Sequence, residues 1–356
     1  MLFVDKYRPK ALSELHYHHD LSKRLSSLAG HEDFPHVLMY GPSGAGKKTR
    51  IACLLRELYG SGTYKLKIDQ RVFVTPSNRK IDVNIVSSNY HIELTPSDAG
   101  IYDRLVIQDI LKEIAQTQNV DLNAKHRFKV VVINEADSLS RDAQSALRRT
   151  MEKYMANLRL VLCATSTSKI IAPIRSRCLL LRVGAPSDDE ASIHSAREGL
   201  FASKERFTIP DAVQTQICDD CNGNLRKAML VLEALRMQSP DLSAGIGIAK
   251  PDWEIYITKT ADLILSDPSP QNLLAVRSKL YELLVHAIPP TLILKHLTDN
   301  LVKKVDSQVR PAIVQKAAFY ELRTRTGSKV IFHLEAFVAA VMHIQKSFLL
   351  GMGWDD

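Results

Sequence analysis

The stretch Gly41-Pro42-Ser43-Gly44-Ala45-Gly46-Lys47 decides the fold of this chain. An apolar run, 34–40, comes before it, and a segment with helical periodicity, 47–58, comes after it. A glycine-rich turn between a buried strand and a helix presents backbone N–H groups to a phosphate, and the helix N-terminus adds positive potential. Because Lys47 stands where a lysine would reach the terminal phosphates, the pattern predicts a phosphate-binding loop.

The metal side of this loop departs from the usual pattern at two positions. Lys48 stands where a Ser or Thr hydroxyl would bind Mg²⁺, and Thr49 lies about 100° further round a helix. A second apolar run, 128–133, leads to Asn134, which replaces the acid that would bind the metal, and to Glu135, which would polarise the attacking water. Since the metal neutralises charge on the phosphate oxygens, we expect nucleotide binding with little or no hydrolysis. Glu135 is then vestigial.

The rest of the first half continues with alternating strands and helices. Further apolar strands are expected at 158–164 and 179–183, and a helix is expected at about 140–154. Continuous apolar strands separated by helices are typical of a parallel sheet with both faces covered. The sequence therefore predicts an α/β domain.

The second half predicts helices only. The strand signals fade after a polar break at 185–190, and residues 187–240 are expected to form short helices. Long amphipathic helices, such as 271–286 and 328–348, follow a linker that contains Pro and Gly. The predicted domains are an α/β domain at 1–185, a small helical domain at 186–240 and an all-helical domain at 250–356.

The composition excludes several classes of protein. The 356 residues are 45% hydrophobic and 24% charged, as in a globular chain with an ample core. No apolar run reaches the roughly 18 residues that a membrane span needs, and no signal peptide is expected. Five cysteines, an odd number, indicate reduced thiols in a cytosolic or nuclear compartment. Cys218 and Cys221 lack a second ligand pair at suitable spacing, so we expect helix cysteines and no metal site.

Six motifs carry a resemblance to a known family. In chain order they are Val4-Asp5-Lys6-Tyr7-Arg8-Pro9, Gly41-Pro42-Ser43-Gly44-Ala45-Gly46-Lys47, Asn134-Glu135-Ala136-Asp137, Ala146-Leu147-Arg148-Arg149-Thr150-Met151-Glu152, Ser176-Arg177-Cys178 and Gly223-Asn224-Leu225-Arg226-Lys227-Ala228. Together they resemble the small subunits of eukaryotic replication factor C, an AAA+ clamp loader. The Gly-Lys-Lys ending of the loop points to one paralogue. The resemblance implies an AAA+ domain, a helical lid and an all-α C-terminal collar that joins the subunits.

The resemblance also implies a site for ATP or ADP, with Mg²⁺ weakly bound or absent. Its residues would be Val4, Tyr7, Arg8 and Pro9 beside the adenine, Gly41, Pro42, Ser43, Gly44, Ala45, Gly46, Lys47, Lys48 and Thr49 in the loop, and Asn134, Thr165 and Arg226 around the phosphates. Thr165 takes a sensor position that is usually Asn in the family. It is a third departure at the hydrolysis site and leaves sensing of the γ-phosphate in doubt.

Two further roles follow from the resemblance. Arg177, in the Ser-Arg-Cys motif, would act in trans as an arginine finger on ATP held by a neighbouring subunit. Arg148, Arg149 and Lys153, on the central helix, would contact DNA phosphates. The alternatives are a contact of one arginine with the neighbour's nucleotide and a solvated basic face.

The implied partners are one large and three other small subunits, the sliding clamp PCNA and primer–template DNA. Alternative large subunits of checkpoint and cohesion loaders are further candidates, and the implied compartment is the nucleus. The rival hypothesis is a self-contained AAA+ ATPase acting on DNA or protein. Lys48 and Asn134 argue against it, so whether the chain is an enzyme by itself stays open.

Overall fold

The computed structural model of the chain consists of two compact units, Met1–Ile248 and Ala249–Asp356. The structure describes residues 1–31, 33–74, 78, 80–116, 128–155, 157–186, 210–221, 223–238, 250–327 and 329–351. The short helices expected at 187–209 and the linker at 239–249 lie outside the described residues. Each unit is a separate body with its own core.

The first unit contains one mixed sheet with the strand order β2-β3-β4-β5-β6-β1-β7. The strands are β1 Val37–Tyr40, β2 Lys67–Val74, β3 Lys80–Ser87, β4 His91–Leu94, β5 Lys129–Ile133, β6 Leu158–Ala164 and β7 Leu179–Arg182. The pairs from β4 to β7 are parallel, whereas β2, β3 and β4 pair antiparallel. The four predicted strands, β5, β6, β1 and β7, are neighbours in the parallel part of the sheet, and β2, β3 and β4 were not predicted.

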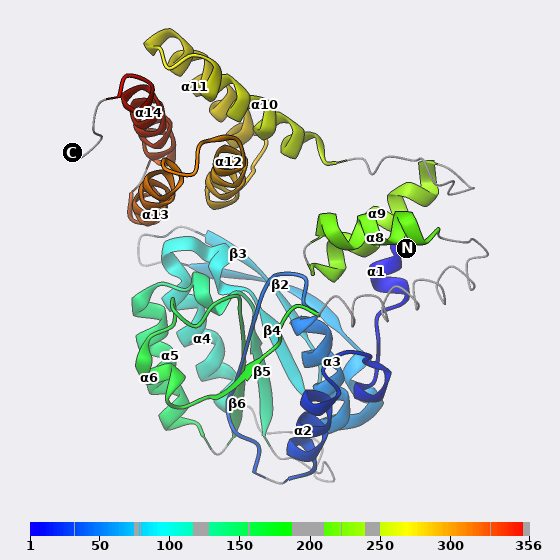
Figure 1. The fold of residues 1–356 in the computed structure, drawn as a ribbon. Helices are drawn as coiled ribbons and strands as arrows, with labels where there is room; N and C mark the ends of the chain where they lie inside the picture. Colours follow the sequence, from blue (N-terminus) through cyan, green and yellow to red (C-terminus); the bar gives the residue numbers. More distant parts are fainter. Residues whose placement is uncertain are drawn as a thin grey trace. The chain divides into compact units, whose positions relative to one another are not determined.

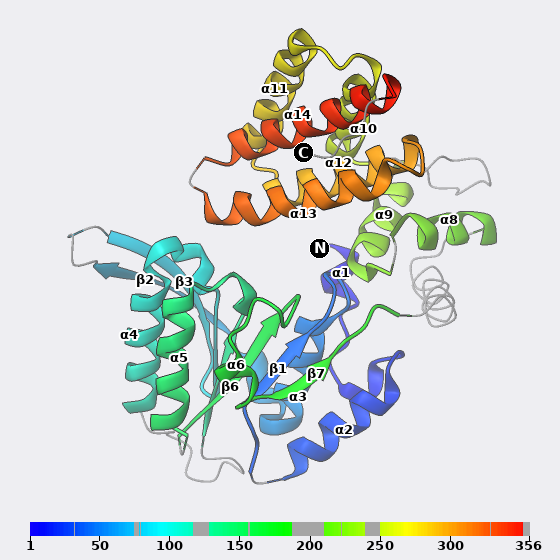
Figure 2. The same cartoon turned by 60° about the vertical axis from the view of Figure 1, so that its left-hand side comes forward.

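Helices cover both faces of this sheet, as predicted (Figures 1 and 2). The elements of the unit are α1 Phe3–Lys6, η1 Leu12–Glu14, α2 His19–Gly30, α3 Lys47–Tyr59, η2 Gly60–Tyr64, η3 Pro96–Tyr102, α4 Asp103–Gln116, η4 Ala136–Ser138, α5 Arg141–Lys153, α6 Ala172–Arg175, α8 Asp211–Cys221 and α9 Leu225–Gln238. Alternate strand residues point to opposite faces. Leu38 and Val131 pack with α4 and α5, and Val37 and Val130 pack with α2 and α3.

The parallel register determines where the site lies. Val37 of β1 is level with Val161 of β6, and Leu94 of β4 is level with Ile133 of β5. The carboxyl ends of β1, β4, β5 and β6 therefore meet at one edge of the sheet. In open α/β sheets, ligands bind in the crevice at this edge.

A small helical lid completes the described part of the first unit. Its helices α8 and α9 pack through Val213, Ile217 and Leu232, together with Cys221. Cys218 and Cys221 lie on α8, as expected for helix cysteines. The N-terminal helix α1 packs on α9, and the Phe3 N–H donates to Glu233 Oε2 at 3.1 Å. The chain's first residues therefore join the lid to the sheet domain.

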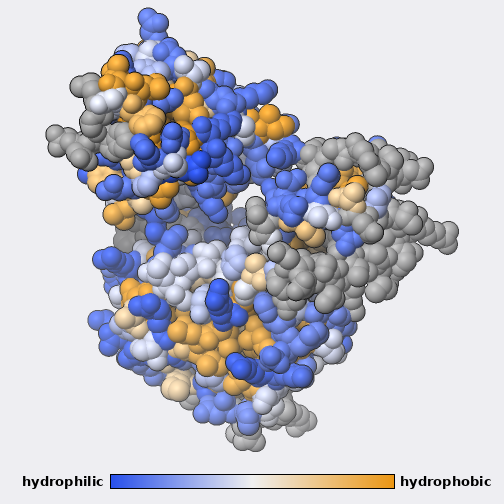
Figure 3. Space-filling model, viewed as in Figure 1, coloured by the Kyte–Doolittle hydropathy of each residue, from blue (hydrophilic) through white to orange (hydrophobic). Residues whose placement is uncertain are grey.

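The second unit is all helical among its described residues, as predicted. Its helices are α10 Asp252–Ser266, α11 Pro270–Val285, α12 Pro290–Lys304, α13 Arg310–Thr326 and α14 Val330–Leu349. Their core includes Ile257, Leu280, Leu297 and Phe337. Figure 3 shows apolar surface interspersed with hydrophilic surface over these helices. In the described parts of the chain, no helix combines the length and the hydropathy that crossing a membrane requires.

Candidate nucleotide-binding site

The glycine-rich loop connects β1 to α3 at the carboxyl edge of the sheet. Gly44 and Gly46 have φ angles of +77° and +78°, which L side chains rarely adopt. A Cβ added to Gly44 would lie 1.7 Å from Asn224 Oδ1, and one added to Gly46 would lie 2.1 Å from Tyr17 Oη. Both positions therefore require glycine for the backbone conformation and for space. The lid and the N-terminal segment both approach the loop within contact distance.

Lys47 lies buried inside the loop, with 8% of its surface exposed. Its ammonium group donates to the carbonyls of Gly41 and Pro42, both at 2.7 Å. Burial lowers the pKa of Lys47, whereas Cys163 and Asp137 act in the opposite direction. The two hydrogen bonds therefore hold the side chain against the start of the loop, away from solvent.

Tyr17 and Arg50 support the loop from behind, and the sequence did not reveal either of them. The Tyr17 hydroxyl donates to the Ala45 carbonyl at 2.9 Å. Arg50 is fully buried, with its guanidinium carbon 4.7 Å from the centre of the Tyr17 ring. It donates to Ser22 Oγ at 2.9 Å and to the Tyr17 carbonyl at 2.5 Å. The sequence did contain an indication that Arg50 is buried, because it lies on the apolar face of α3 beside Ile51.

A cavity of about 470 Å³ lies beside the loop and is bounded by the N-terminal segment and α9. The predicted residues that line it are Val4, Tyr7, Arg8, Pro9, Gly44, Gly46, Thr49 and Arg226. Leu225 and Met229 of α9 add apolar surface that the sequence did not point to. The structure thus brings the N-terminal box, the loop and the lid to one cavity.

A smaller cavity of about 140 Å³ adjoins the first on the side of the strand ends. Its lining includes the predicted residues Arg8, Ser43, Gly44, Gly46, Lys47, Lys48, Thr49, Glu135, Thr165 and Arg226. Arg8 and Arg226 line both cavities. The two spaces therefore share basic side chains at their junction, as expected where a polyphosphate would lie.

The strand ends on this side carry mixed charges. Asn134 is buried and its Nδ2 donates to Glu93 Oε1 at 2.7 Å, while its Oδ1 has no hydrogen-bond partner within the described residues. Glu135 is exposed and has a left-handed backbone, with φ of +50°. Asp137 accepts from the N–H of Thr165 at 3.3 Å and from its hydroxyl. Asn134 itself is not among the residues that line either cavity.

No metal centre is formed by protein groups alone in the part of the chain that the structure describes. There, no three His, Cys, Asp or Glu side chains converge as ligands of an ion. The acids that accept hydrogen bonds from Asn134 and Thr165, Glu93 and Asp137 respectively, were not among the predicted site residues. The parallel register of β4, β5 and β6 brings Glu93 beside Asn134 and Asp137 beside Thr165.

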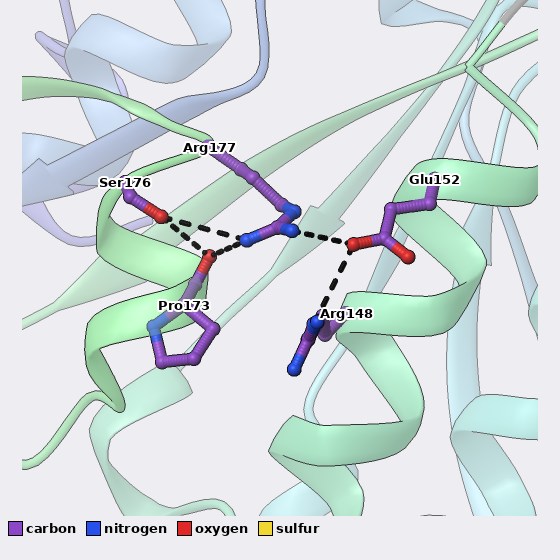
Figure 4. A network of polar contacts seen from close by, with 5 residues as sticks. All are labelled: Arg148, Glu152, Pro173, Ser176 and Arg177. Carbon is purple, nitrogen blue, oxygen red and sulfur yellow. Dashed lines mark hydrogen bonds and ion pairs between the residues drawn. The ribbon is translucent and has the colours of Figure 1, made fainter.

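Arg177 lies outside both cavities, in the turn after α6 (Figure 4). Its guanidinium donates to the Pro173 carbonyl at 2.8 Å and to Glu152 Oε1 at 2.5 Å. Arg148 reaches the same oxygen at 3.5 Å. Arg149 and Lys153 are also exposed on α5, as a solvent-facing or ligand-facing basic surface requires. Glu152, which joins Arg148 to Arg177, was missed by sequence reasoning about these arginines.

Three family models match separate parts of the chain. They are "Replication factor C subunit 3, C-terminal domain" at residues 253–349, "RCF1/5-like, AAA+ ATPase lid domain" at 201–237, and "DNA polymerase III, delta subunit" at 17–187. Among solved structures, a Thermotoga maritima RuvB mutant superposes with a TM-score of 0.50 at 18% identity, over 77% of this chain and 85% of that one. This likeness concerns the fold alone and agrees with an AAA+ domain followed by a helical lid.

Curated relatives match over nearly the whole chain. Replication factor C subunit 5 of Neurospora crassa is 56% identical over 351 residues, which cover 99% of both chains. Replication factor C subunit 5 of Schizosaccharomyces pombe is 53% identical, again with 99% of each covered. Human replication factor C subunit 3 is 50% identical over 98% of this chain and 97% of the relative. The chain therefore belongs to the family of replication factor C subunits 3 and 5, small AAA+ subunits of the clamp loader of DNA replication.

Proposed function

We propose that this chain binds nucleotide with little or no hydrolysis, as one subunit of a heteropentameric clamp loader. The assembly uses ATP to open PCNA and to load it onto primer–template DNA in replication and repair. The observation that carries the proposal is the pair of adjoining cavities, which share Arg8, Gly44, Gly46, Thr49 and Arg226. An AAA+ domain whose loop keeps its glycines and Lys47 implies nucleotide binding.

The residues present fit a nucleotide. The larger cavity offers apolar side chains from Val4, Tyr7 and Met229, which suit a purine ring. The smaller one offers the N-terminus of α3, with Lys47 and Arg226 beside it, which suit phosphates. Within the described residues, the Arg226 guanidinium forms no hydrogen bond or ion pair, so it is available to a ligand. ATP and ADP both remain candidates.

The groups on the metal side fit an active hydrolase poorly. Mg²⁺ prefers oxygen ligands in octahedral geometry, but position 48 offers an ammonium and Asn134 offers only an amide. That amide donates to Glu93, which leaves one uncharged oxygen. Thr165 is engaged with Asp137. We therefore propose that Mg²⁺ is weakly bound or absent and that Glu135 is vestigial.

The other proposed roles concern neighbours in the assembly. Arg177 would serve in trans at the nucleotide of an adjacent subunit, and Arg148, Arg149 and Lys153 would face DNA. Exposed apolar side chains on the second unit, including Leu274, Val285 and Leu322, support its proposed role as a collar. The partners would be one large and three small subunits, with alternative large subunits in checkpoint and cohesion loaders. The compartment would be the nucleus, and the domains would be 1–185, 186–240 and 250–356.

The test separates this proposal from a self-contained ATPase. The full chain is purified alone and titrated with fluorescent ADP and ATP, and its Mg²⁺-dependent turnover is compared with that of Lys47→Ala. We expect binding by the wild type and equal, negligible turnover by both proteins. Turnover that Lys47→Ala abolishes would support the ATPase instead.

A second test concerns Arg177 in the assembled complex. Arg177→Ala should lower clamp- and DNA-stimulated turnover by about 10²–10³ at the one affected site, and the total only in part. Arg175→Ala, which removes the same charge two residues away, is the matched control. Wild-type turnover and wild-type loading with Arg177→Ala would contradict the trans role.

A further inference from the structure

The backbone around Arg177 is fixed to the central helix α5. Ile174 and Cys178, on either side of Arg177, are buried in the same cluster as the apolar face of α5. Gln144 of α5 accepts from the Ile171 N–H at 2.9 Å and donates to the Lys169 carbonyl at 3.1 Å. The segment that carries Arg177 is therefore packed on α5 and hydrogen-bonded to it, and what remains to be set is the direction of the arginine side chain.

That direction is set by contacts on opposite sides of the guanidinium group, with Pro173 and Ser176 on one side and Glu152 on the other (Figure 4). Nη1 donates to the Pro173 carbonyl at 2.8 Å, which is a contact within the turn itself. Nη2 donates to Glu152 Oε1 at 2.5 Å, which is a contact with α5. The Arg177 side chain keeps 33% of its surface exposed. It is therefore held in one direction while part of it stays accessible to a neighbouring molecule.

Glu152 also joins two cations that would otherwise repel each other. The Oε1 atom that accepts from Arg177 is 3.5 Å from Arg148 Nε. Partial desolvation raises the pKa of Glu152, but the hydrogen bonds and charges of Arg177 and then Arg148 outweigh it, so the pKa is lowered. The carboxylate is thus charged at neutral pH. It is the shared anion between the proposed trans finger and a proposed DNA contact.

We infer that Glu152 is a positioning residue for Arg177: it holds the guanidinium on the central helix, with Arg148 as the second cation on the same carboxylate oxygen. This inference rests on the proposed role of Arg177 in trans. A planar guanidinium that is held by a carboxylate populates fewer rotamers before a ligand binds. The entropy cost of orienting it on binding is therefore lower. If Arg148 turned toward a DNA phosphate, Glu152 would lose one of its two donors, and its contact with Arg177 would change as a result.

The first test measures the contact without any activity assay. The full chain is labelled with ¹³C at glutamate carboxyls, and the pKa of Glu152 is followed by NMR. Arg177→Ala should move this pKa upward toward that of an ordinary glutamate, and Arg148→Ala should move it upward by less, because its contact is longer. Arg175→Ala should leave it unchanged. An equal Glu152 pKa in Arg177→Ala and Arg175→Ala would overturn the inference.

The second test uses the assembled complex with Glu152→Gln, which keeps the shape of the side chain and removes its charge. Asp142→Asn, also exposed on α5, is the matched control for net charge. Exposed ion pairs are modest, so we expect turnover stimulated by clamp and DNA to fall about two- to five-fold with Glu152→Gln and not with Asp142→Asn. Thermal unfolding of the two variants should be alike.

The outcomes separate the inference from the function on which it rests. Normal turnover with Arg177→Ala would refute the trans role itself. Reduced turnover with Arg177→Ala but wild-type turnover with Glu152→Gln would refute only the positioning role of Glu152. Reduced turnover with both variants, together with the predicted rise in the Glu152 pKa, would support both.

Discussion

Substituting alanine for Gly46 should disturb the phosphate loop through two separable effects. The backbone of Gly46 has a φ of +78°, which is unfavourable for any residue with a Cβ. The new Cβ would also lie 2.1 Å from Tyr17 Oη, the hydroxyl that donates to the Ala45 carbonyl. The first effect belongs to Gly46 alone, whereas the second disappears when Tyr17 has no hydroxyl.

The magnitudes follow from these two contacts. A left-handed backbone costs an L residue about 1–2 kcal/mol, and displacing the hydroxyl forfeits a hydrogen bond worth about 1 kcal/mol. Gly46→Ala should therefore cost about 2–3 kcal/mol, and Tyr17→Phe alone about 1 kcal/mol. The double variant should cost no more than Gly46→Ala, since the hydroxyl is lost in both. The expected coupling is about 1 kcal/mol, or roughly five-fold in affinity.

The assay is a double-mutant cycle in the full chain. Nucleotide affinity is measured by titration with fluorescent ADP, and stability is measured by urea unfolding. Both are needed because a loop that relaxes around the new Cβ loses less stability and more nucleotide affinity. Gly30→Ala is the control, since a Cβ there meets nothing within 4 Å. Full additivity of Gly46→Ala and Tyr17→Phe would refute the reasoning, as would unchanged affinity and stability in Gly46→Ala.

Three further predictions concern charged or titratable groups. Burial, and then Arg159, lowers the pKa of His36 to about 4, so His36 stabilises the fold above pH 6.5 and this contribution is lost as the pH falls toward 4. Urea unfolding should show a loss of about 2 kcal/mol between pH 6.5 and 5, absent in His36→Gln. Lys47→Ala should reduce nucleotide retention by the purified complex more than its total turnover, and wild-type occupancy would contradict this. Lys48→Thr with Asn134→Asp should raise Mg²⁺ affinity in calorimetric titrations, and an unchanged affinity would show that other groups define the defect.

The parts of the fold that the sequence predicted are those with strong local patterns. The loop at 41–47 and the buried strands around it have uninterrupted apolar runs and a specific turn, so β1, β5, β6 and β7 were all expected. The antiparallel pair β2 and β3 was missed because β2 is an edge strand with exposed apolar residues, such as Ile68 at 77% exposure. β4 has the sequence His91-Ile92-Glu93-Leu94, in which polar and apolar residues alternate. It therefore lacks the continuous apolar run that marked the predicted parallel strands.

The residues missed at the site were those that act through long-range contacts. Glu93 meets Asn134 only because β4 and β5 pair in parallel with Leu94 level with Ile133. Tyr17 meets the loop across 28 residues of sequence. A single sequence contains no register between distant strands, so such pairs can be found only in three dimensions. The residues of the phosphate loop, in contrast, were identifiable from their local spacing. Tyr7, Arg177 and Arg226 were assigned only through the family resemblance.

The close approach of Asn224 to Gly44 connects the phosphate loop with the start of the lid. Asn224 immediately precedes α9, and its Oδ1 accepts the Lys227 N–H at 3.1 Å, so it caps the first turn of that helix. The same oxygen is the atom that a Cβ at position 44 would strike. A larger residue at position 44 would displace Asn224 from the loop. The first turn of α9 would then lose its cap and become less stable. The absence of a side chain at Gly44 thus allows the lid to approach the phosphate loop this closely.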